Sequence, residues 1–304
     1  MYFVLRKSKT FNLSIKCQLY LFDAMVDPIL LYGCEIWGFE NCKQIESVHL
    51  NFPRKLLPIR KSTHLYMLYG ELGRVPLSNS IKCRMVCFGA KVLSGKEQKL
   101  SRILYQMLYI EVCTNNSCKK WIKCLESIFN ETGFSFYWLT WLSQQAIPPN
   151  ALKSIMSLTL SDIATHTWNA EITHSSKGIT YRIFKTELVL EKYKLVIPFS
   201  LAVKFLLFGT SCHHLPIELG RWHNIPVKER TCKLCDMSDV GDEFHFIFVC
   251  PYFKPQRKLY VPISYAKNPN ILKFKELFNC KKINVIKKLC TFCNVIMKTV
   301  KSSM

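Results

Sequence analysis

Four side chains with the chemistry of zinc ligands stand close together in one short stretch of the chain. In RTCKLCDMSDVGDEFHFIFVCP, the residues Cys232, Cys235, His245 and Cys250 follow the spacing C-x2-C-x9-H-x4-C. Three thiolates and one imidazole make a complete tetrahedral ligand set that leaves no open position, so the pattern predicts a structural zinc. The x2 gap allows one tight turn to present both of the first cysteines. The x4 gap returns the histidine and the last cysteine to the same side.

Other cysteines leave an alternative ligand set open. The chain has 15 cysteines, so four residues of this kind can also fall together by chance. Cys290 and Cys293 form a second C-x2-C pair with Cys280 nearby, and this pair could complete a four-cysteine site with Cys232 and Cys235. The competing interpretation is that Cys290 and Cys293 are packed thiols, because they lie in an amphipathic helical pattern.

The charge of the chain points to nucleic acid as a partner. Lysine and arginine number 42 against 21 acidic residues, which gives a net charge of +21. Such an excess favours contacts with RNA or DNA phosphates, which carry no sequence information. The candidate phosphate-binding residues flank the zinc motif: Arg221, Lys228, Arg230, Lys233, Lys254, Arg257 and Lys258. Nucleic acid should avoid the acidic loop between the ligands, which contains Asp236, Asp239, Asp242 and Glu243.

Apolar residues recur mostly at helical spacing, which predicts a mainly α protein. We expect helical bundle-like segments and a small loop-rich CCHC zinc knuckle near the carboxyl terminus. The expected organisation has four parts: a helical region at 1–147, a helical connector at 148–220, the zinc knuckle at 221–255 and a basic helical tail at 256–304. The break at AIPPN, residues 146–150, marks the first boundary.

Several classes of function lack their motifs. The chain contains no Asp-Asp pair, no glycine-rich phosphate loop and no G-x-S-x-G, so we expect no enzyme and no small-molecule substrate. No apolar run reaches the roughly 20 residues that a membrane span needs, so no membrane partner is expected. The start of the chain lacks the features of a signal peptide, which favours the nucleus or cytoplasm and reduced cysteines.

A histidine-rich segment just before the knuckle leaves a different interpretation open. His213, His214, Glu218 and His223 could form a catalytic or metal-binding cluster. The simpler alternative is a loop salt bridge between Glu218 and Arg221 with a neighbouring tryptophan as a packing anchor. That tryptophan, Trp222, could also stack on a nucleic-acid base.

Two segments together resemble a known family. LFDAMVDPILLYGCEIWG, residues 21–38, resembles the segment just beyond the polymerase palm and thumb in LINE-type non-LTR retrotransposon reverse transcriptases. GRWHNIPVKERTCKLCDMSDVGDEFHFIFVCP, residues 220–251, resembles the carboxyl-terminal cysteine-rich module of the same polyproteins. The two segments keep the order and separation that the family shows, so the resemblance covers essentially the whole chain.

The resemblance implies a nucleic-acid-binding carboxyl-terminal fragment of a reverse transcriptase polyprotein. It implies that Cys232, Cys235, His245 and Cys250 are the zinc ligands and that the missing polymerase domain is a partner. No catalytic residue carries over, because the palm carboxylates and the endonuclease have no counterpart here. Two departures suit a decaying element copy: Gly209 stands where a basic residue is usual, and Pro53 interrupts the second expected helix. A structural or protein-interaction zinc module is the alternative function.

Overall fold

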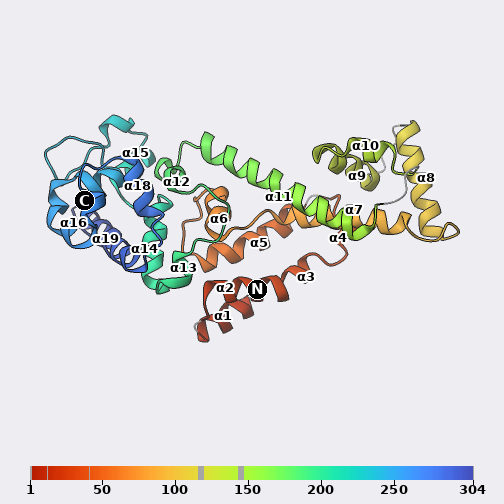
Figure 1. Cartoon of the computed structure of the whole chain (residues 1–304), viewed down its shortest axis with the longest axis horizontal. Coiled ribbons are helices and arrows are strands. Elements are labelled where there is room, and N and C mark those ends of the chain that lie inside the picture. Colours follow the sequence, from red (N-terminus) through yellow and green to blue (C-terminus); the bar gives the residue numbers. More distant parts are fainter. Residues whose placement is uncertain (1, 12, 41, 116–119, 143–146, 304) are drawn as a thin grey trace. The chain divides into compact units, whose positions relative to one another are not determined.

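The computed structural model describes residues 2–11, 13–40, 42–115, 120–142 and 147–303, and the expectation of a mainly α protein is confirmed. Helices follow one another along the chain (Figure 1), and the described residues form no strand beyond two isolated antiparallel bridges. The chain divides into two compact units, the first made of residues 1–13, 17–52 and 75–167 and the second of residues 14–16, 53–74 and 168–304. These units cut across the sequence ranges expected above.

In the described part of the first unit, ten helices belong to it wholly or mostly. They are α1 Tyr2–Thr10, α2 Ile15–Met25, α3 Asp27–Leu30, α4 Cys34–Trp37, α5 Lys43–Leu56, α7 Leu77–Leu93, α8 Leu100–Asn115, α9 Lys120–Glu131, α10 Ser135–Leu139 and α11 Pro149–His174. Helix α7 is central, since α4, α8 and α9 all pack against it. Its apolar face carries fully buried Met85 and Val86, and Gly38 allows the chain after α4 to approach Ile81 closely.

The second unit carries the zinc motif. Its elements are α6 Leu65–Leu72, α12 Ile179–Phe184, α13 Tyr193–Val196, α14 Phe199–Gly209, α15 Pro216–Trp222, η1 Val227–Glu229, η2 His245–Val249, η3 Pro251–Phe253, α16 Lys254–Tyr260, α17 Ile263–Ala266, α18 Ile271–Phe278 and α19 Ile283–Ser302. Helices α14 and α19 lie side by side (Figure 1) and form the main helix pair of the unit.

Phenylalanines fill the core of the second unit. Phe278 stacks on Phe184 and Phe205, with ring centroids 5.0 and 5.1 Å apart. Gly209 belongs to this core, because a Cβ atom there would lie 2.9 Å from Cζ of Phe184. A basic side chain at this position would therefore collide with the aromatic cluster, which gives a packing reason for the glycine in this chain.

Proline and glycine positions explain how the helices differ from the sequence-based expectation. Helix α5 continues through Pro53 to Leu56, although a mid-helix proline removes one hydrogen bond. Within the expected helical connector at 148–220, α11 ends at His174, and Gly178 adopts φ +71° before α12 begins. At the expected boundary AIPPN, Ala146 lies outside the described residues, and α11 begins within the motif at Pro149.

None of the helices in the described ranges combines the length and apolar character needed to cross a bilayer.

Candidate metal centre

The structure brings the four predicted ligands together. One ligand atom from each of Cys232, Cys235, His245 and Cys250 lies within 4.8 Å of every other. The Sγ atoms of Cys232 and Cys250 are 3.9 Å apart, and Cys235 Sγ lies 3.5 Å from Nε2 of His245. Both distances are too long for covalent bonds, and all four described cysteines of the two C-x2-C pairs are free thiols.

These separations match the edges of a zinc tetrahedron. With Zn–S of about 2.3 Å and Zn–N of about 2.05 Å, tetrahedral geometry places two sulfurs about 3.8 Å apart and a sulfur and a nitrogen about 3.6 Å apart. The observed 3.9 and 3.5 Å agree with both edges. The donor set therefore fits Zn²⁺, which would hold the loops together without an open position for substrate.

A small turn presents the first two cysteines. Thr231 and Val240 pair in an antiparallel bridge, and the amide of Cys232 donates to the carbonyl of Asp239 at 2.9 Å. The amide of Leu234 points at Cys232 Sγ at 3.4 Å, so the backbone supports the sulfur as a negatively charged ligand. Most of the expected loop character is confirmed here, including one hairpin-like pairing.

A turn of π-helix presents the other two ligands. Element η2 runs from His245 to Val249, and the amide of Cys250 donates to the carbonyl of His245 at 2.7 Å. The wider π turn suits an x4 gap, because its hydrogen bond joins residues i and i+5, which are His245 and Cys250 here. Asp242 caps this element, accepting the amide of His245 at 2.7 Å.

Burial shifts the pKa values of Cys232, Cys250 and His245 when no metal is bound. Burial raises the pKa of Cys232 to about 12, with Cys250 and Cys235 as further causes. Burial likewise raises the pKa of Cys250 and lowers that of His245. Without a metal these thiols stay protonated at neutral pH, whereas bound Zn²⁺ would deprotonate them outright. Nδ1 of His245 lies 3.7 Å from an Asp239 carboxylate oxygen, so the free ring nitrogen faces a potential acceptor.

Arg257 supports the candidate metal centre by binding the backbone of the segment that carries its last ligand. It is only 9% exposed, and it donates from Nε to the carbonyl of Ile247 at 2.7 Å and from Nη2 to that of Cys250 at 2.8 Å. Sequence reasoning placed Arg257 among the phosphate-binding residues. The structure instead directs its guanidinium at the backbone that carries the last ligand.

Two contacts anchor the ligand segment to the rest of the unit. Phe253, just after the last ligand, is fully buried against Phe246 and Phe292, which brings the segment onto α19. Glu243 is also buried and accepts hydrogen bonds from His213 at 2.8 Å and Thr180 at 2.7 Å. The acidic loop is therefore less uniform than its sequence indicated, since Glu243 faces inward while Asp236 and Asp239 are exposed.

The alternative ligand set is not assembled in the part of the chain that the structure describes. The one group of metal-ligand atoms within reach of Cys232 and Cys235 contains His245 and Cys250. Cys290 and Cys293 are fully buried on α19, where burial raises the pKa of Cys290 to about 12. They are packed thiols, as the competing interpretation held.

The other predicted phosphate-binding residues divide into two groups. Lys228, Lys233, Lys254 and Lys258 are exposed. Arg221 and Arg230 have intramolecular partners: Arg221 pairs with Glu218 at 2.8 Å, and Arg230 donates to the carbonyls of Ile217 and Ile225. Four of the seven side chains are thus exposed lysines.

The expected histidine and glutamate cluster separates into different environments. His213 is buried against Glu243, while Glu218 pairs with Arg221, as the salt-bridge alternative held. His214 is exposed and contacts Arg60 and Trp222. His213 and Glu218 therefore serve packing, and the segment does not gather them around one substrate position.

Compared with protein-family models, curated proteins and solved structures, the chain matches none of them.

Proposed function

We propose that this protein is a zinc-stabilised nucleic-acid-binding module descended from the carboxyl-terminal region of a LINE-type reverse transcriptase polyprotein. The observation that carries the proposal is the Cys₃His centre, whose ligand spacings fit tetrahedral zinc within a chain of net charge +21. Zinc has a structural role in this proposal: it closes the loops between α15 and α16. The polymerase domain of such a polyprotein and the backbone of RNA or DNA are the partners that we propose.

Exposed lysines beside the centre support phosphate contacts. Lys228 and Lys233 lie before and within the first ligand turn, and Lys254 and Lys258 lie on α16 directly after the last ligand. A lysine that neutralises a phosphate releases a counterion, so affinity should fall steeply with salt. Four such contacts to a single strand give a slope of log affinity against log salt of about −2.8.

The first test is zinc stoichiometry on the purified chain. One zinc per chain is expected in the wild type and in Cys290→Ala, and none or weakly held zinc in Cys235→Ser. Cys290→Ala is the matched control because it belongs to the second C-x2-C pair and lies outside the ligand group. A folded wild-type chain without zinc would contradict the metal centre.

The second test measures binding of labelled single-stranded RNA and DNA across a salt series. Replacing Lys228 and Lys233 by Gln should flatten the salt slope by about 1.4, since two phosphate contacts are removed. The control replaces two exposed lysines of the first unit, Lys91 and Lys96, in the same way. If both double variants flatten the salt slope equally, the loss of overall charge explains the change, and Lys228 and Lys233 are not specific phosphate contacts.

One observation favours the alternative, a protein-interaction module. Large apolar side chains around the centre are exposed, among them Val227 at 48%, Met237 at 47% and Tyr252 at 50%. Exposed apolar groups with a charged rim are typical of protein-binding surfaces. Zinc binding with weak, salt-insensitive RNA affinity would support this alternative over the nucleic-acid proposal.

A further inference from the structure

Three planar side chains that do not belong to the ligand group meet on the surface of the second unit. The Arg60 guanidinium lies over the Trp222 ring, with Cζ 4.4 Å from the centroid. Nη2 of Arg60 is 3.0 Å from Nε2 of His214, and the His214 ring meets that of Trp222 edge-on at 5.9 Å. Trp222 is 42% exposed and His214 is also exposed. We call these three residues the stacking cluster.

The stacking cluster is surrounded by positive charge. Burial lowers the pKa of His214, and Arg60 and Lys301 lower it further, so its neutral ring accepts the hydrogen bond from Arg60. Burial lowers the pKa of nearby His64 in the same way, with Lys177 and Arg221 as the next causes. The carboxylates that face these groups are Glu218, which Arg221 already pairs with, and Glu171.

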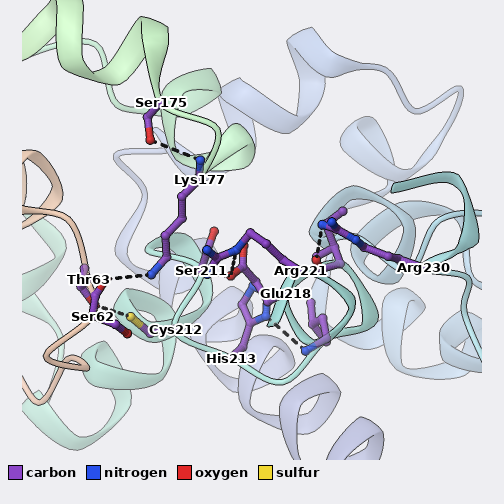
Figure 2. A network of polar contacts seen from close by, with 12 residues as sticks. Ser62, Thr63, Ser175, Lys177, Ser211, Cys212, His213, Glu218, Arg221 and Arg230 are labelled. Carbon is purple, nitrogen blue, oxygen red and sulfur yellow. Dashed lines mark hydrogen bonds and ion pairs between the residues drawn. The ribbon is translucent and has the colours of Figure 1, made fainter. Parts of the chain in front are cut away.

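Within the described ranges, one of these cations is buried without an ion pair to a carboxylate. Lys177 is 4% exposed, and its Nζ donates to the carbonyl of Ser62 at 3.3 Å (Figure 2). The other two buried lysines of the unit differ: Lys185 pairs with Glu191, and Lys194 pairs with Glu71. Burial lowers the pKa of Lys177, and Arg221 and Arg60 lower it further, while Cys212 and Glu218 act in the opposite direction without cancelling the shift. An anion bound nearby would stabilise this group of cations, since buried charges are otherwise costly.

We propose that the stacking cluster, with Lys177 and Arg221 behind it, binds one unpaired nucleotide of a single-stranded nucleic acid. The base would stack on the Trp222–Arg60 pair, and its phosphate would offset the surrounding positive charge. This inference rests on the proposed function and names its substrate class. A duplex fits less well, because its bases are already stacked on one another and their faces are not free. A phosphorylated peptide would satisfy the charge but has no flat base for the exposed ring.

The test compares oligo(dT) with an abasic strand of the same length, so that the phosphates stay constant. Binding is measured by fluorescence anisotropy at one moderate salt concentration on the full, zinc-loaded chain. Trp222→Ala should weaken oligo(dT) binding about tenfold, because one base loses the aromatic ring on which it stacks. It should leave binding of the abasic strand unchanged. Trp222→Phe, which keeps an aromatic ring, should stay within about threefold of the wild type.

Arg60→Lys separates stacking from charge. The lysine keeps the positive charge, so the salt slope should not change, but it loses the planar group and should lower the preference for oligo(dT) over the abasic strand. Tyr252→Ala is the matched control, because Tyr252 is an exposed aromatic residue of the same unit at 50% exposure.

The outcomes distinguish this inference from the function on which it rests. If the wild type shows no salt-sensitive binding to oligo(dT), the proposed function fails and the inference fails with it. If the wild type binds but Trp222→Ala behaves like Tyr252→Ala, only the stacking site is wrong. Equal wild-type affinity for the abasic strand and for oligo(dT) would also overturn it, leaving a phosphate site alone.

Discussion

Replacing Arg257 by methionine tests how far the metal centre depends on its supporting arginine. Methionine keeps the length and apolar stem of the side chain but removes both donors. Each hydrogen bond from a charged donor contributes about 1.5–3 kcal/mol, so the two bonds to the carbonyls of Ile247 and Cys250 amount to about 3–6 kcal/mol. Part of this stabilisation is offset, because burial disfavours the charge of Arg257 and lowers its pKa. We expect a net loss of about 2–4 kcal/mol in unfolding free energy.

The same substitution should weaken zinc binding. Arg257 fixes the carbonyl of the ligand Cys250, and its positive charge lies near a centre whose three thiolates and Zn²⁺ sum to a net charge of −1. Loss of such an outer partner typically lowers metal affinity about 10–100-fold. Urea unfolding of the zinc-loaded protein measures the stability, and competition with a chromophoric chelator measures the affinity.

Two further variants make the result interpretable. Lys258→Met changes the next residue of the same helix, which is exposed, and should leave both quantities unchanged. Arg257→Lys keeps the charge but cannot bridge both carbonyls, so it should fall between the wild type and Arg257→Met. Zinc affinity and unfolding of Arg257→Met that match those of Lys258→Met would refute the reasoning.

Two other predictions concern the core of the second unit. Glu71→Gln leaves the buried ammonium of Lys194 unpaired and should cost about 3–5 kcal/mol in urea unfolding, whereas a cost under 1 kcal/mol would contradict a paired charge. Burial raises the pKa of Glu71, but Lys194 and Lys185 outweigh it and lower the pKa overall. The Glu71–Lys194 ion pair therefore stabilises the fold fully at pH values above the usual carboxyl pKa. This stabilisation is lost as the pH falls through the lowered pKa of Glu71. Acid should destabilise the wild type more than Glu71→Gln. Gly209→Ala should destabilise by about 1–2 kcal/mol, because overpacking against Phe184 outweighs the better helix propensity of alanine. A raised thermal midpoint in this variant would contradict that packing argument.

The ligand set could be predicted from the sequence because a metal centre of this kind is encoded locally. Its four residue types and their spacings are all visible within residues 232–250, and short gaps permit few geometries. The mainly helical secondary structure could be predicted equally well, since helical periodicity is a local signal. Gly178 shows where that signal weakens, because the helical pattern continues past the end of α11 at His174 and through this residue of positive φ, which precedes α12.

The support of the centre could not be predicted, because its partners are distant in sequence. Glu243 lies in an acidic loop and gives no sign that it pairs with His213, 30 residues earlier. Arg257 resembles any basic residue of the tail, and only the packing of α16 against α19 buries it. Arg60 and Trp222 likewise meet only through the tertiary fold. A side chain's charge is read directly from sequence, but whether water or a carbonyl surrounds that charge is not.

The contacts between the first ligand turn and α15 suggest why a buried zinc would matter for binding at an exposed surface. Arg230 stands two residues before Cys232, and it donates to the carbonyl of Ile217 at the start of α15 and to that of Ile225 beyond its end. Gly241 closes the same link, because its amide donates to the carbonyl of Arg230 and its carbonyl accepts the amide of Ile217. Zinc that fixes Cys232 therefore restrains both ends of the helix that terminates in Trp222. On this argument, metal removal should weaken oligo(dT) binding through the loss of base stacking, and binding of the abasic strand should change less.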